Sequence, residues 1–398
     1  MTVFNSLGSN YDFSFVFKSL FAKNKPDFAA NLQEFLQKKY NGEAHLVYKG
    51  REALELVLKV LDLSKDSYVA INGYTCYAVY KSIANRGYRV YYLDIESKSF
   101  NFSAEELEKA LQKNPLIKVV IIQNTLGYPC EIEKISKVCK EKNIILIEDL
   151  AHSIGTVYSN GKEAGTVGDF VILSFSQDKM IDAVSGGALI IKNKKYQKIF
   201  KDEIQKITLG RELLDRLYPL FTWTIRKTYS VGLGKFIHYF LKKTNLLSTP
   251  MDESFYEVYG LPFWYCFLVL DSFNRIKENL THRRKIANIY KNNLDKKLLS
   301  ESVTKLINSS SNLRFPVFVN KRDRLIGFLE KEKIYISDTW YDSPIGPKRY
   351  LKETDYNGQC PNSEETSSLV VNLPTHINIS EEDALIISQK ISQWLKLQ

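Results

Sequence analysis

The feature that most constrains the fold is a regular alternation of apolar strands and helices between residues 43 and 191. Short apolar runs at 68–71, 89–93, 117–122 and 144–147 are separated by segments with helical periodicity. Strands joined through helices pair in parallel, and their sheet needs a helical layer on each face. The sequence therefore predicts an α/β fold with a mainly parallel sheet covered by helices.

An acidic pair follows one of these strands. The run 144–147 leads into Glu148 and Asp149, and ligands of open α/β sheets bind at the carboxyl ends of the strands. An aspartate at this place can pair with the protonated nitrogen of a pyridine ring. Neighbouring residues of a strand point to opposite faces, so Glu148 is expected to be structural.

Lys179 lies in a loop between two further apolar runs, 170–175 and 188–191. A lysine held between buried strands is desolvated, which lowers its pKa and makes its amine a nucleophile, as a Schiff-base lysine requires. An ordinary surface lysine is the alternative, and this segment alone leaves it open.

A turn at Gly50, Arg51 and Glu52 opens a helix that extends to about residue 61. Free N–H groups at a helix N-terminus bind phosphate. A phosphate-binding turn, an acid for a ring nitrogen and a Schiff-base lysine follow one another along the chain. These are the three contacts that pyridoxal phosphate needs.

These segments resemble the DegT/DnrJ/EryC1/StrS (sugar) aminotransferases, which are pyridoxal-phosphate enzymes of fold type I. The resemblance is strong over about residues 30–195 and weaker elsewhere. The motifs that carry it are Gly50-Arg-Glu-Ala-Leu, Asn72-Gly-Tyr-Thr-Cys-Tyr-Ala, Val90-Tyr-Tyr-Leu-Asp-Ile, Ile147-Glu-Asp-Leu-Ala-His-Ser-Ile-Gly, Gly168-Asp-Phe, and Ser174 through Lys179 to Gly186-Gly187-Ala. It implies an N-terminal segment (1–45), a large cofactor-binding domain (46–250) and a smaller C-terminal α/β domain (251–398).

The resemblance also implies roles for single residues. Lys179 would bind the cofactor and move a proton, which argues against the related sugar dehydratases, where this lysine is replaced. Asp149 would hold the ring nitrogen. The other matching positions are His152 near the ring hydroxyl, Ser174 near the phosphate, Gly50, Arg51 and Glu52 in the phosphate turn, and Asn124 at a strand tip. For His152 a role as a core histidine is the alternative, and no metal site is expected.

Two positions depart from the family pattern. Cys76 stands where many members carry an aromatic residue that stacks on the ring, a part that Tyr74 or Tyr77 could take. An Asn-Tyr-Arg type segment, which the partner subunit donates to the phosphate, is not recognisable around residues 255–265. Arg51 could compensate for it. A non-catalytic scaffold with this fold is therefore a second hypothesis.

For the whole protein, the resemblance implies a homodimeric aminotransferase. Glutamate would be the amino donor, and the acceptor a keto-sugar, carried on a nucleotide, for glycan or polysaccharide assembly. The formal net charge of +10 is compatible with a diphosphate substrate, and no nucleic-acid-binding motif is found. Five scattered cysteines, with no signal peptide, indicate the cytoplasm.

Residues 213–247 interrupt the α/β pattern with a segment rich in aromatic and cationic side chains. It lacks an apolar run long enough to span a bilayer. Two interpretations stay open: a helical hairpin packed on the body or at the dimer contact, and an amphipathic segment on an anionic membrane surface. The second would fit a lipid-linked substrate. Further on, 274–295 is expected to be a helix whose basic residues at 282–285 form a solvated face.

Overall fold

A seven-stranded sheet forms the centre of the computed structural model, which describes residues 2–197, 205–248, 257–336 and 341–398. Across the sheet, the strands are β2 (Glu43–Val47), β9 (Gly187–Ile191), β8 (Phe170–Ser174), β7 (Ile145–Asp149), β6 (Ile117–Ile122), β3 (Tyr68–Asn72) and β5 (Arg89–Leu93). The five strands from β8 to β5 are parallel, while β9 runs antiparallel to both of its neighbours. The predicted α/β class is confirmed.

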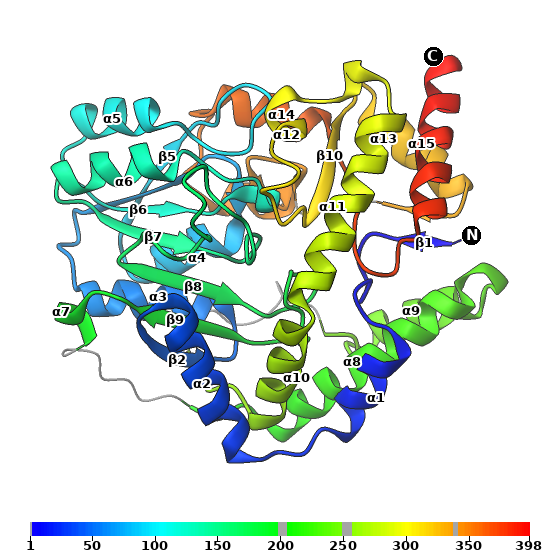
Figure 1. The fold of residues 1–398 in the computed structure, drawn as a ribbon, viewed down its shortest axis with the longest axis horizontal. Helices are drawn as coiled ribbons and strands as arrows, with labels where there is room; N and C mark the ends of the chain where they lie inside the picture. Colours follow the sequence, from blue (N-terminus) through cyan, green and yellow to red (C-terminus); the bar gives the residue numbers. More distant parts are fainter. Residues whose placement is uncertain (1, 198–204, 249–256, 337–340) are drawn as a thin grey trace.

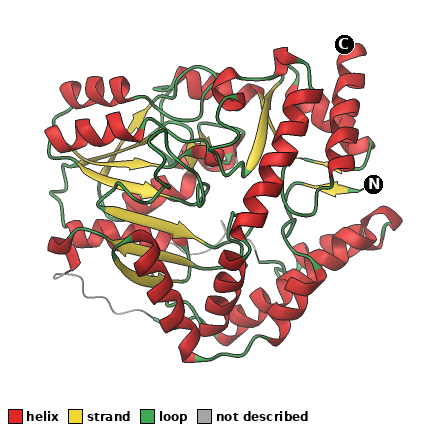
Figure 2. Cartoon of the chain, viewed as in Figure 1, coloured by secondary structure: helices red, strands yellow, loops and turns green. Residues whose placement is uncertain are grey.

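Helices cover both faces of this sheet, as Figure 2 shows. On β6, Val119 and Ile121 belong to the apolar cluster that contains α3 (Gly50–Leu61) and α4 (Tyr77–Asn85). Val120 and Ile122 point to the opposite cluster. The helices of that opposite face are α2 (Pro26–Tyr40), α5 (Ala104–Lys113), α6 (Ile132–Glu141) and α10 (Phe263–Asn274). The two-residue period of the strands thus determines which helix layer each side chain meets.

A smaller unit follows, built on the antiparallel pair β10 (Arg314–Phe318) and β13 (Val370–Pro374). Its helices are α11 (Ile276–Asn293), α13 (Arg322–Lys331), α14 (Pro361–Leu369) and α15 (Glu381–Lys396). The first strand of the chain, β1 (Val3–Phe4), pairs with β11 (Ile334–Tyr335) of this unit. Shorter elements are β4 (Thr75–Cys76) paired with β12 (Ile345–Gly346), and helices α7 (Lys194–Gln197) and α12 (Glu301–Thr304). The proposed boundaries at residues 45 and 250 stay a prediction.

Residues 209–243 form a helical hairpin of α8 (Leu209–Thr228) and α9 (Leu233–Lys243), next to α1 (Phe13–Phe21), at the lower right of Figure 1. The hairpin turns at Gly232, whose φ of 86° favours glycine. At Gly234, any Cβ would collide with the carbonyl of Ile225, so only glycine lets α9 cross α8 this closely. The structure contains a packed hairpin, as the first interpretation of this segment predicts. Contact of the segment with a membrane stays a prediction.

The expectation of a solvated basic face at residues 282–285 is wrong for Arg283. Its side chain is fully buried and donates hydrogen bonds to the Leu313 carbonyl (3.1 Å), to Thr375 Oγ1 (3.1 Å) and to Asn279 Oδ1 (2.8 Å). Burial lowers its pKa to about 9. Because β10 and β13 cover this part of α11, neutral oxygens rather than water solvate the guanidinium.

Candidate active site

A cavity lies at the carboxyl ends of β7 and β8, beside the N-terminus of α3. Seven of the nine predicted site residues line it: Gly50, Arg51, Cys76, Asp149, His152, Ser174 and Lys179. Sequence reasoning missed Lys49, Gln123, Ser176 and Gln177, which also line it. The chain thus brings together residues that are up to 130 positions apart in the sequence.

Asp149 is the last residue of β7 and lies on the same face as Ile147, toward α3. Gln123 donates from Nε2 to Oδ2 (3.1 Å), and the backbone N–H of Ala151 donates to Oδ1 (2.9 Å). Burial raises the pKa of this carboxyl, although both donors oppose the shift. A protonated ring nitrogen would supply the positive partner that a buried carboxylate requires.

Glu148 points to the opposite face, as the strand period predicts. Its carboxylate accepts the backbone N–H groups of Gly165 (2.7 Å), Val167 (2.7 Å) and Gly168 (2.6 Å). The Tyr158 hydroxyl donates a fourth hydrogen bond (2.8 Å). The structural role expected for Glu148 is confirmed, because this carboxylate fixes the backbone before β8.

Both ring nitrogens of His152 have partners within the protein. The Leu126 N–H donates to Nδ1 (3.3 Å), which leaves the proton on Nε2, 2.8 Å from the Tyr341 hydroxyl. Burial lowers the pKa of His152 well below its ordinary value, so the ring is neutral. His152 therefore lines the cavity as a neutral ring, held in place by Tyr341 of the C-terminal unit. Its position near the cofactor hydroxyl stays a prediction.

Lys179 lies in the loop between β8 and β9. Desolvation lowers the pKa of its amine, while Cys76 and Asp149 oppose the shift. The loop is fastened from the N-terminal segment, because Asn10 Nδ2 donates to the Lys179 carbonyl (3.2 Å) and to Asp182 Oδ2 (3.1 Å). The position of the lysine thus depends on residues far outside its own motif.

Asp182 stabilises the strained backbone of the same loop. Two non-glycine residues there have positive φ, Asp178 at 62° and Val184 at 72°. The Asp182 carboxylate accepts the backbone N–H of Asp178 (2.8 Å), the N–H of Val184 (3.0 Å) and the Tyr11 hydroxyl (2.6 Å). For a β-branched residue such as Val184 this conformation is unfavourable, so the Asp182 contacts hold a loop shape that its local sequence does not prefer.

The N-terminus of α3 packs directly on β8. A Cβ at Gly50 would lie 2.8 Å from Ser174 Cβ and 3.2 Å from the Leu173 carbonyl, so glycine permits this close approach. The first amides of a helix have no acceptor within the helix. Together with the Ser174 hydroxyl, the Gly50 and Arg51 amides provide the donors that a phosphate group requires.

Glu52 and Asn124 do not line the cavity. The Glu52 carboxylate accepts the backbone N–H groups of Tyr48 (3.1 Å) and Tyr259 (3.2 Å), and so joins the start of α3 to the segment before α10. Asn124 donates to the Tyr158 hydroxyl (2.8 Å) and accepts the Cys130 N–H (2.9 Å). Their side chains shape the turns beside the cavity, and contact with a cofactor at these positions stays a prediction without structural support.

The two tyrosines that could have replaced Cys76 against a ring are also engaged elsewhere. Tyr74 is buried and donates to the Tyr341 carbonyl (3.3 Å). Tyr77 donates to Glu353 (2.7 Å) and stacks on Tyr350, with 4.7 Å between the ring centroids. Cys76 itself lines the cavity, and burial raises the pKa of its thiol, which keeps it neutral.

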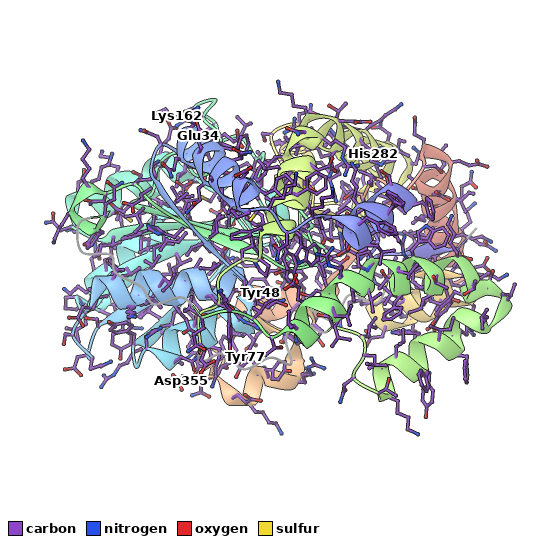
Figure 3. All side chains as sticks on the ribbon, turned by 90° about the horizontal axis from the view of Figure 1, so that it is seen from below. Glu34, Tyr48, Tyr77, Lys162, His282 and Asp355 are labelled. Carbon is purple, nitrogen blue, oxygen red and sulfur yellow. The ribbon has the colours of Figure 1, made fainter. Side chains whose placement is uncertain are left out.

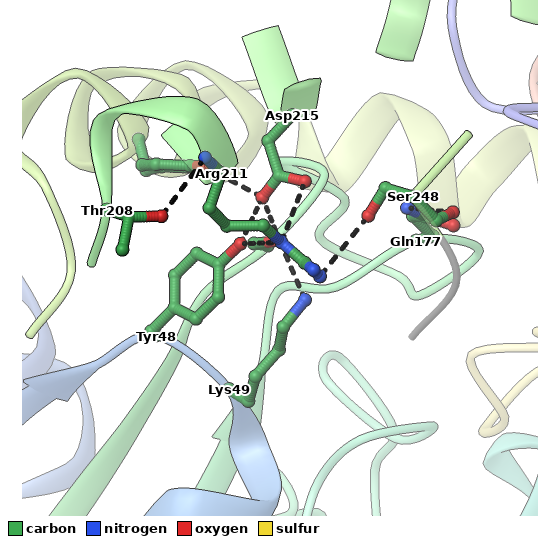
Figure 4. Close-up of polar contacts among 9 residues, drawn as sticks. Tyr48, Lys49, Gln177, Thr208, Arg211, Asp215 and Ser248 are labelled. Atoms are coloured by element: carbon green, nitrogen blue, oxygen red, sulfur yellow. Dashed lines mark hydrogen bonds and ion pairs between the residues drawn. The ribbon is translucent and has the colours of Figure 1, made fainter. Parts of the chain in front are cut away.

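A buried polar network continues the cavity toward α8 (Figure 4). Lys49, only 3% exposed, donates from Nζ to Ser185 Oγ (2.8 Å). Asp215 of α8 accepts from Ser185 Oγ (2.6 Å), from the Tyr48 hydroxyl (2.5 Å) and from the Tyr265 hydroxyl (2.8 Å). Lys49 directly precedes the phosphate turn and could have been suspected from sequence, but its link to Asp215 requires the packing of α8.

Positive charge predominates in this network. Arg211 Nε lies 3.7 Å from Asp215 Oδ1, and Lys49 and Arg211 lower the Asp215 pKa despite its burial. Burial, reinforced by Arg211 and Arg51, lowers the Lys49 pKa to about 7, although Asp215 opposes the shift. Burial also raises the Glu52 pKa to about 7, which weakens it as a counter-charge. An anion in the cavity would therefore be favoured electrostatically.

Comparison with known proteins connects this site to a family. The profile of the DegT/DnrJ/EryC1/StrS aminotransferase family matches residues 19–209 and 263–392. This chain belongs to that family. The predicted resemblance and the predicted class of enzyme, a pyridoxal-phosphate-dependent aminotransferase, are thereby confirmed.

Three relatives show the range of the match. A GDP-perosamine synthase of Vibrio cholerae is 31% identical over 163 residues, which cover 41% of this chain and 43% of that protein. PseC of Helicobacter pylori, an aminotransferase involved in the biosynthesis of pseudoaminic acid, superimposes with a TM-score of 0.76 at 16% identity, and all of both chains is covered. The PLP-form of Spr1654, described as a putative sugar aminotransferase from Streptococcus pneumoniae, has a TM-score of 0.71 at 18% identity with the same coverage.

The family profile leaves out residues 210–262, which contain nearly all of the α8–α9 hairpin and therefore Asp215. An Asn-Tyr-Arg type segment is not recognisable in the sequence around residues 255–265, and residues 255 and 256 of that range lie outside the described residues. In the part that follows, the Tyr48 N–H donates to the Tyr259 carbonyl (2.8 Å), and Val47 pairs with Gly260. This segment therefore packs on the start of α3 in its own chain.

Proposed function

We propose that this aminotransferase binds pyridoxal phosphate in the cavity and transfers an amino group to a keto-sugar, carried on a nucleotide, in glycan or polysaccharide assembly. The observation that carries the proposal is the single cavity lined by Lys179, Asp149 and the N-terminus of α3. The sugar-nucleotide part is supported by the similarity to a GDP-perosamine synthase.

The donor set of the cavity fits the cofactor. The Gly50 and Arg51 amides, the Ser174 hydroxyl and the nearby Lys49 ammonium suit a phosphate dianion. The Asp149 carboxylate suits a protonated ring nitrogen. Cys76 is small and neutral, so it leaves room for the cofactor ring. An aromatic side chain at this position would instead stack on that ring.

Pyridoxal phosphate, when bound, supplies an aldehyde for the amino group and a ring that withdraws electrons from the reacting carbon. Lys179 would hold the aldehyde carbon, and its amine would take and return the proton at the substrate carbon that bears nitrogen. Its lowered pKa favours the neutral, proton-accepting form. Asp149 would keep the ring nitrogen protonated, and His152 would line the site as a neutral polar side chain.

The family resemblance supports glutamate as the amino donor and a homodimer as the working form. The cytoplasm is supported by the five cysteines, all of which are free, because free thiols persist in a reducing compartment.

The first experiment is a visible absorbance spectrum of the purified protein, recorded before and after the addition of glutamate. A yellow band that bleaches with glutamate, and that fails to respond in Lys179→Ala, is the expected result. A colourless protein that added pyridoxal phosphate cannot reconstitute would overturn the proposal and favour the scaffold hypothesis. A coloured protein that ignores glutamate but bleaches with another amino acid would correct the donor alone.

A second candidate substrate is a keto-sugar carried on a lipid, because α1, α8 and α9 expose apolar and cationic side chains together. Turnover of a lipid-linked keto-sugar in vesicles, compared with its nucleotide-linked counterpart, separates the two. Faster turnover of the nucleotide-linked compound in the presence and absence of vesicles would exclude the lipid-linked candidate.

A further inference from the structure

Exposed apolar side chains are concentrated in one region of the molecule. Among the described residues, fifteen large hydrophobic side chains are exposed, and eleven of them lie on α1 or between Leu209 and Leu246. We call this region the α1/α8/α9 surface, and its exposed apolar members are Phe13, Phe17, Phe21, Leu209, Leu213, Val231, Leu233, Phe236, Tyr239, Phe240 and Leu246. The surface of a soluble monomeric protein seldom carries so many exposed apolar side chains in one region unless that region binds a partner.

On α9, the aromatic side chains point away from the protein body. Gly234 and Leu241 are buried in the hairpin, while Phe236, Tyr239 and Phe240 are 67%, 66% and 51% exposed. Figure 3 shows α8 and α9 along one edge of the molecule, with side chains extending outward. α9 therefore uses small and aliphatic residues to pack and leaves its aromatic residues to solvent, the reverse of an ordinary amphipathic helix.

α1 adds a second exposed aromatic stripe and is joined rigidly to the hairpin. Its Phe15, Val16 and Ser19 are buried, whereas the three phenylalanines of the α1/α8/α9 surface recur every fourth residue on the outer side. Arg216 of α8 donates to the Ser19 (3.1 Å) and Ala22 (2.9 Å) carbonyls. The Phe13 ring also packs on Trp223, at 5.6 Å between centroids. α1 and α9 are therefore both packed on α8, and each carries exposed aromatic side chains.

One long stretch of this surface carries no acidic residue. Residues 216–247 contain six lysines and arginines and no aspartate or glutamate. Elsewhere on the surface, helical lysines pair with glutamates one turn away, as Lys38 does with Glu34 (2.6 Å) and Lys305 with Glu301 (2.6 Å). On α9, the exposed Lys235 precedes the aromatic residues, and the exposed Lys242 and Lys243 follow them. No acidic residue of the segment can pair with these lysines.

We propose that the α1/α8/α9 surface docks on an anionic lipid membrane. Aromatic side chains would enter the headgroup region while the lysines bind lipid phosphates, the combination that interfacial helices use. A protein interface is less well matched, because lysine is depleted from interface cores. In the part of the chain that the structure describes, no helix is long and apolar enough to cross a membrane, so the contact is peripheral. The proposal does not depend on the chemistry proposed for the cavity.

The test is flotation of the full-length holoenzyme with vesicles of phosphatidylcholine, with and without phosphatidylserine. Binding should require phosphatidylserine and weaken at high salt. Replacing Lys235, Lys242 and Lys243 with glutamine should weaken binding on the order of 100-fold, at about 1 kcal/mol for each lysine. Phe236→Ser combined with Phe240→Ser should weaken binding as well.

Matched controls distinguish this surface from general stickiness. Leu385→Ser combined with Leu397→Ser removes exposed apolar side chains on α15 and directly after it, and Lys38→Gln combined with Lys305→Gln removes exposed charges elsewhere. Both controls should bind vesicles as the unmodified protein does. Each variant is first checked for an unchanged circular dichroism spectrum and oligomeric mass.

Failure of the unmodified protein to float with anionic vesicles would overturn the proposal. So would a loss of oligomeric mass in the aromatic variant without a change in flotation, because a second copy of the chain would then be what covers this face. Equal weakening by the α15 control would also refute it, since binding would not depend on the α1/α8/α9 surface.

Discussion

Two regions of this molecule combine cationic and aromatic side chains, the cavity network and the α1/α8/α9 surface, and they differ in their access to water. In the network, Lys49 is buried and donates to Ser185 Oγ, which in turn donates to Asp215, and desolvation lowers the pKa of the lysine. On α9, Lys235 is exposed on a segment without acidic residues. The cations of the network have a buried carboxylate as a fixed partner, whereas the exposed lysines of α9 have no acidic partner in their own segment.

α8 belongs to both regions. Its Asp215 is completely buried in the network, while Leu213, two residues earlier, is 57% exposed. The helix that supplies the counter-charge of the cavity therefore also carries the proposed membrane face, and the family profile includes almost none of it. Substitutions in the cavity network that leave vesicle binding unchanged, and substitutions on the α1/α8/α9 surface that leave stability unchanged, would show that the two regions act independently.

The largest effect is expected from a substitution in the cavity, at Asp149. Asp149→Asn keeps the size of the side chain but removes the charge that holds a ring nitrogen proton, so turnover should fall roughly 10³-fold. Vesicle binding should not change. Steady-state kinetics with glutamate measures the loss, and Asp66→Asn, an exposed acid, is the control. Wild-type turnover in Asp149→Asn would contradict the assignment.

Next in size is the loss of the buried counter-charge. Asp215→Asn leaves Arg211 and Lys49 without their carboxylate, and removing one partner of a buried ion pair costs about 3–5 kcal/mol of unfolding free energy. Urea denaturation measures this cost. The control is Glu212→Gln, whose partly exposed and longer pair with Arg216 (3.8 Å) should be worth less than about 1 kcal/mol. Equal effects of the two variants would show that the network is solvated.

The pH dependence of stability should distinguish buried from exposed lysines. Because the folded pKa of Lys49 is about 7, below that of an ordinary lysine, the unfolded chain binds more protons above pH 7, and stability should rise with pH. In cofactor-free protein, Lys49→Met should reduce the rise in unfolding free energy between pH 7 and 9 by about 2 kcal/mol. Lys235→Met, which removes an exposed lysine, is measured as the control. An unchanged slope in Lys49→Met would place Lys49 in contact with water.

A glycine pair tests the connection between α8 and α9. Gly234→Ala puts a methyl group into the Ile225 carbonyl and should cost about 1–3 kcal/mol by overpacking. Gly210→Ala, in open space near the start of α8, should be neutral or slightly stabilising. Thermal unfolding measures both. Equal melting temperatures for the two variants would refute the close crossing of the helices.

The smallest effect on stability is expected on the exposed face. Lys235→Gln should change unfolding free energy by less than about 0.5 kcal/mol, yet weaken flotation with anionic vesicles about fivefold. A single preparation can be used for urea denaturation and flotation. A marked loss of stability would mean that Lys235 belongs with the buried cations rather than the exposed ones.

The strand pattern was enough to orient the two neighbouring acids at the end of β7. Alternation along β7 was enough to direct Asp149 toward α3 and Glu148 away from it, because the period of two is a local property of the backbone. The same reasoning could not place Asn124, since a polar residue at a strand tip can face the cavity or support the turn. Arg283 was misjudged because a basic helical face is solvated only where no second layer covers it.

The sequence by itself determined the sheet, the order of the phosphate turn, the acid and the lysine, and the family to which the chain belongs. Local periodicity and motif order carry that information. Only the tertiary structure decided that Asp215 approaches Lys49, that Asn10 fastens the lysine loop, and that α9 turns its aromatic residues outward. Those outcomes depend on how distant segments pack and exclude water, and no local pattern records which side chain a distant helix will cover.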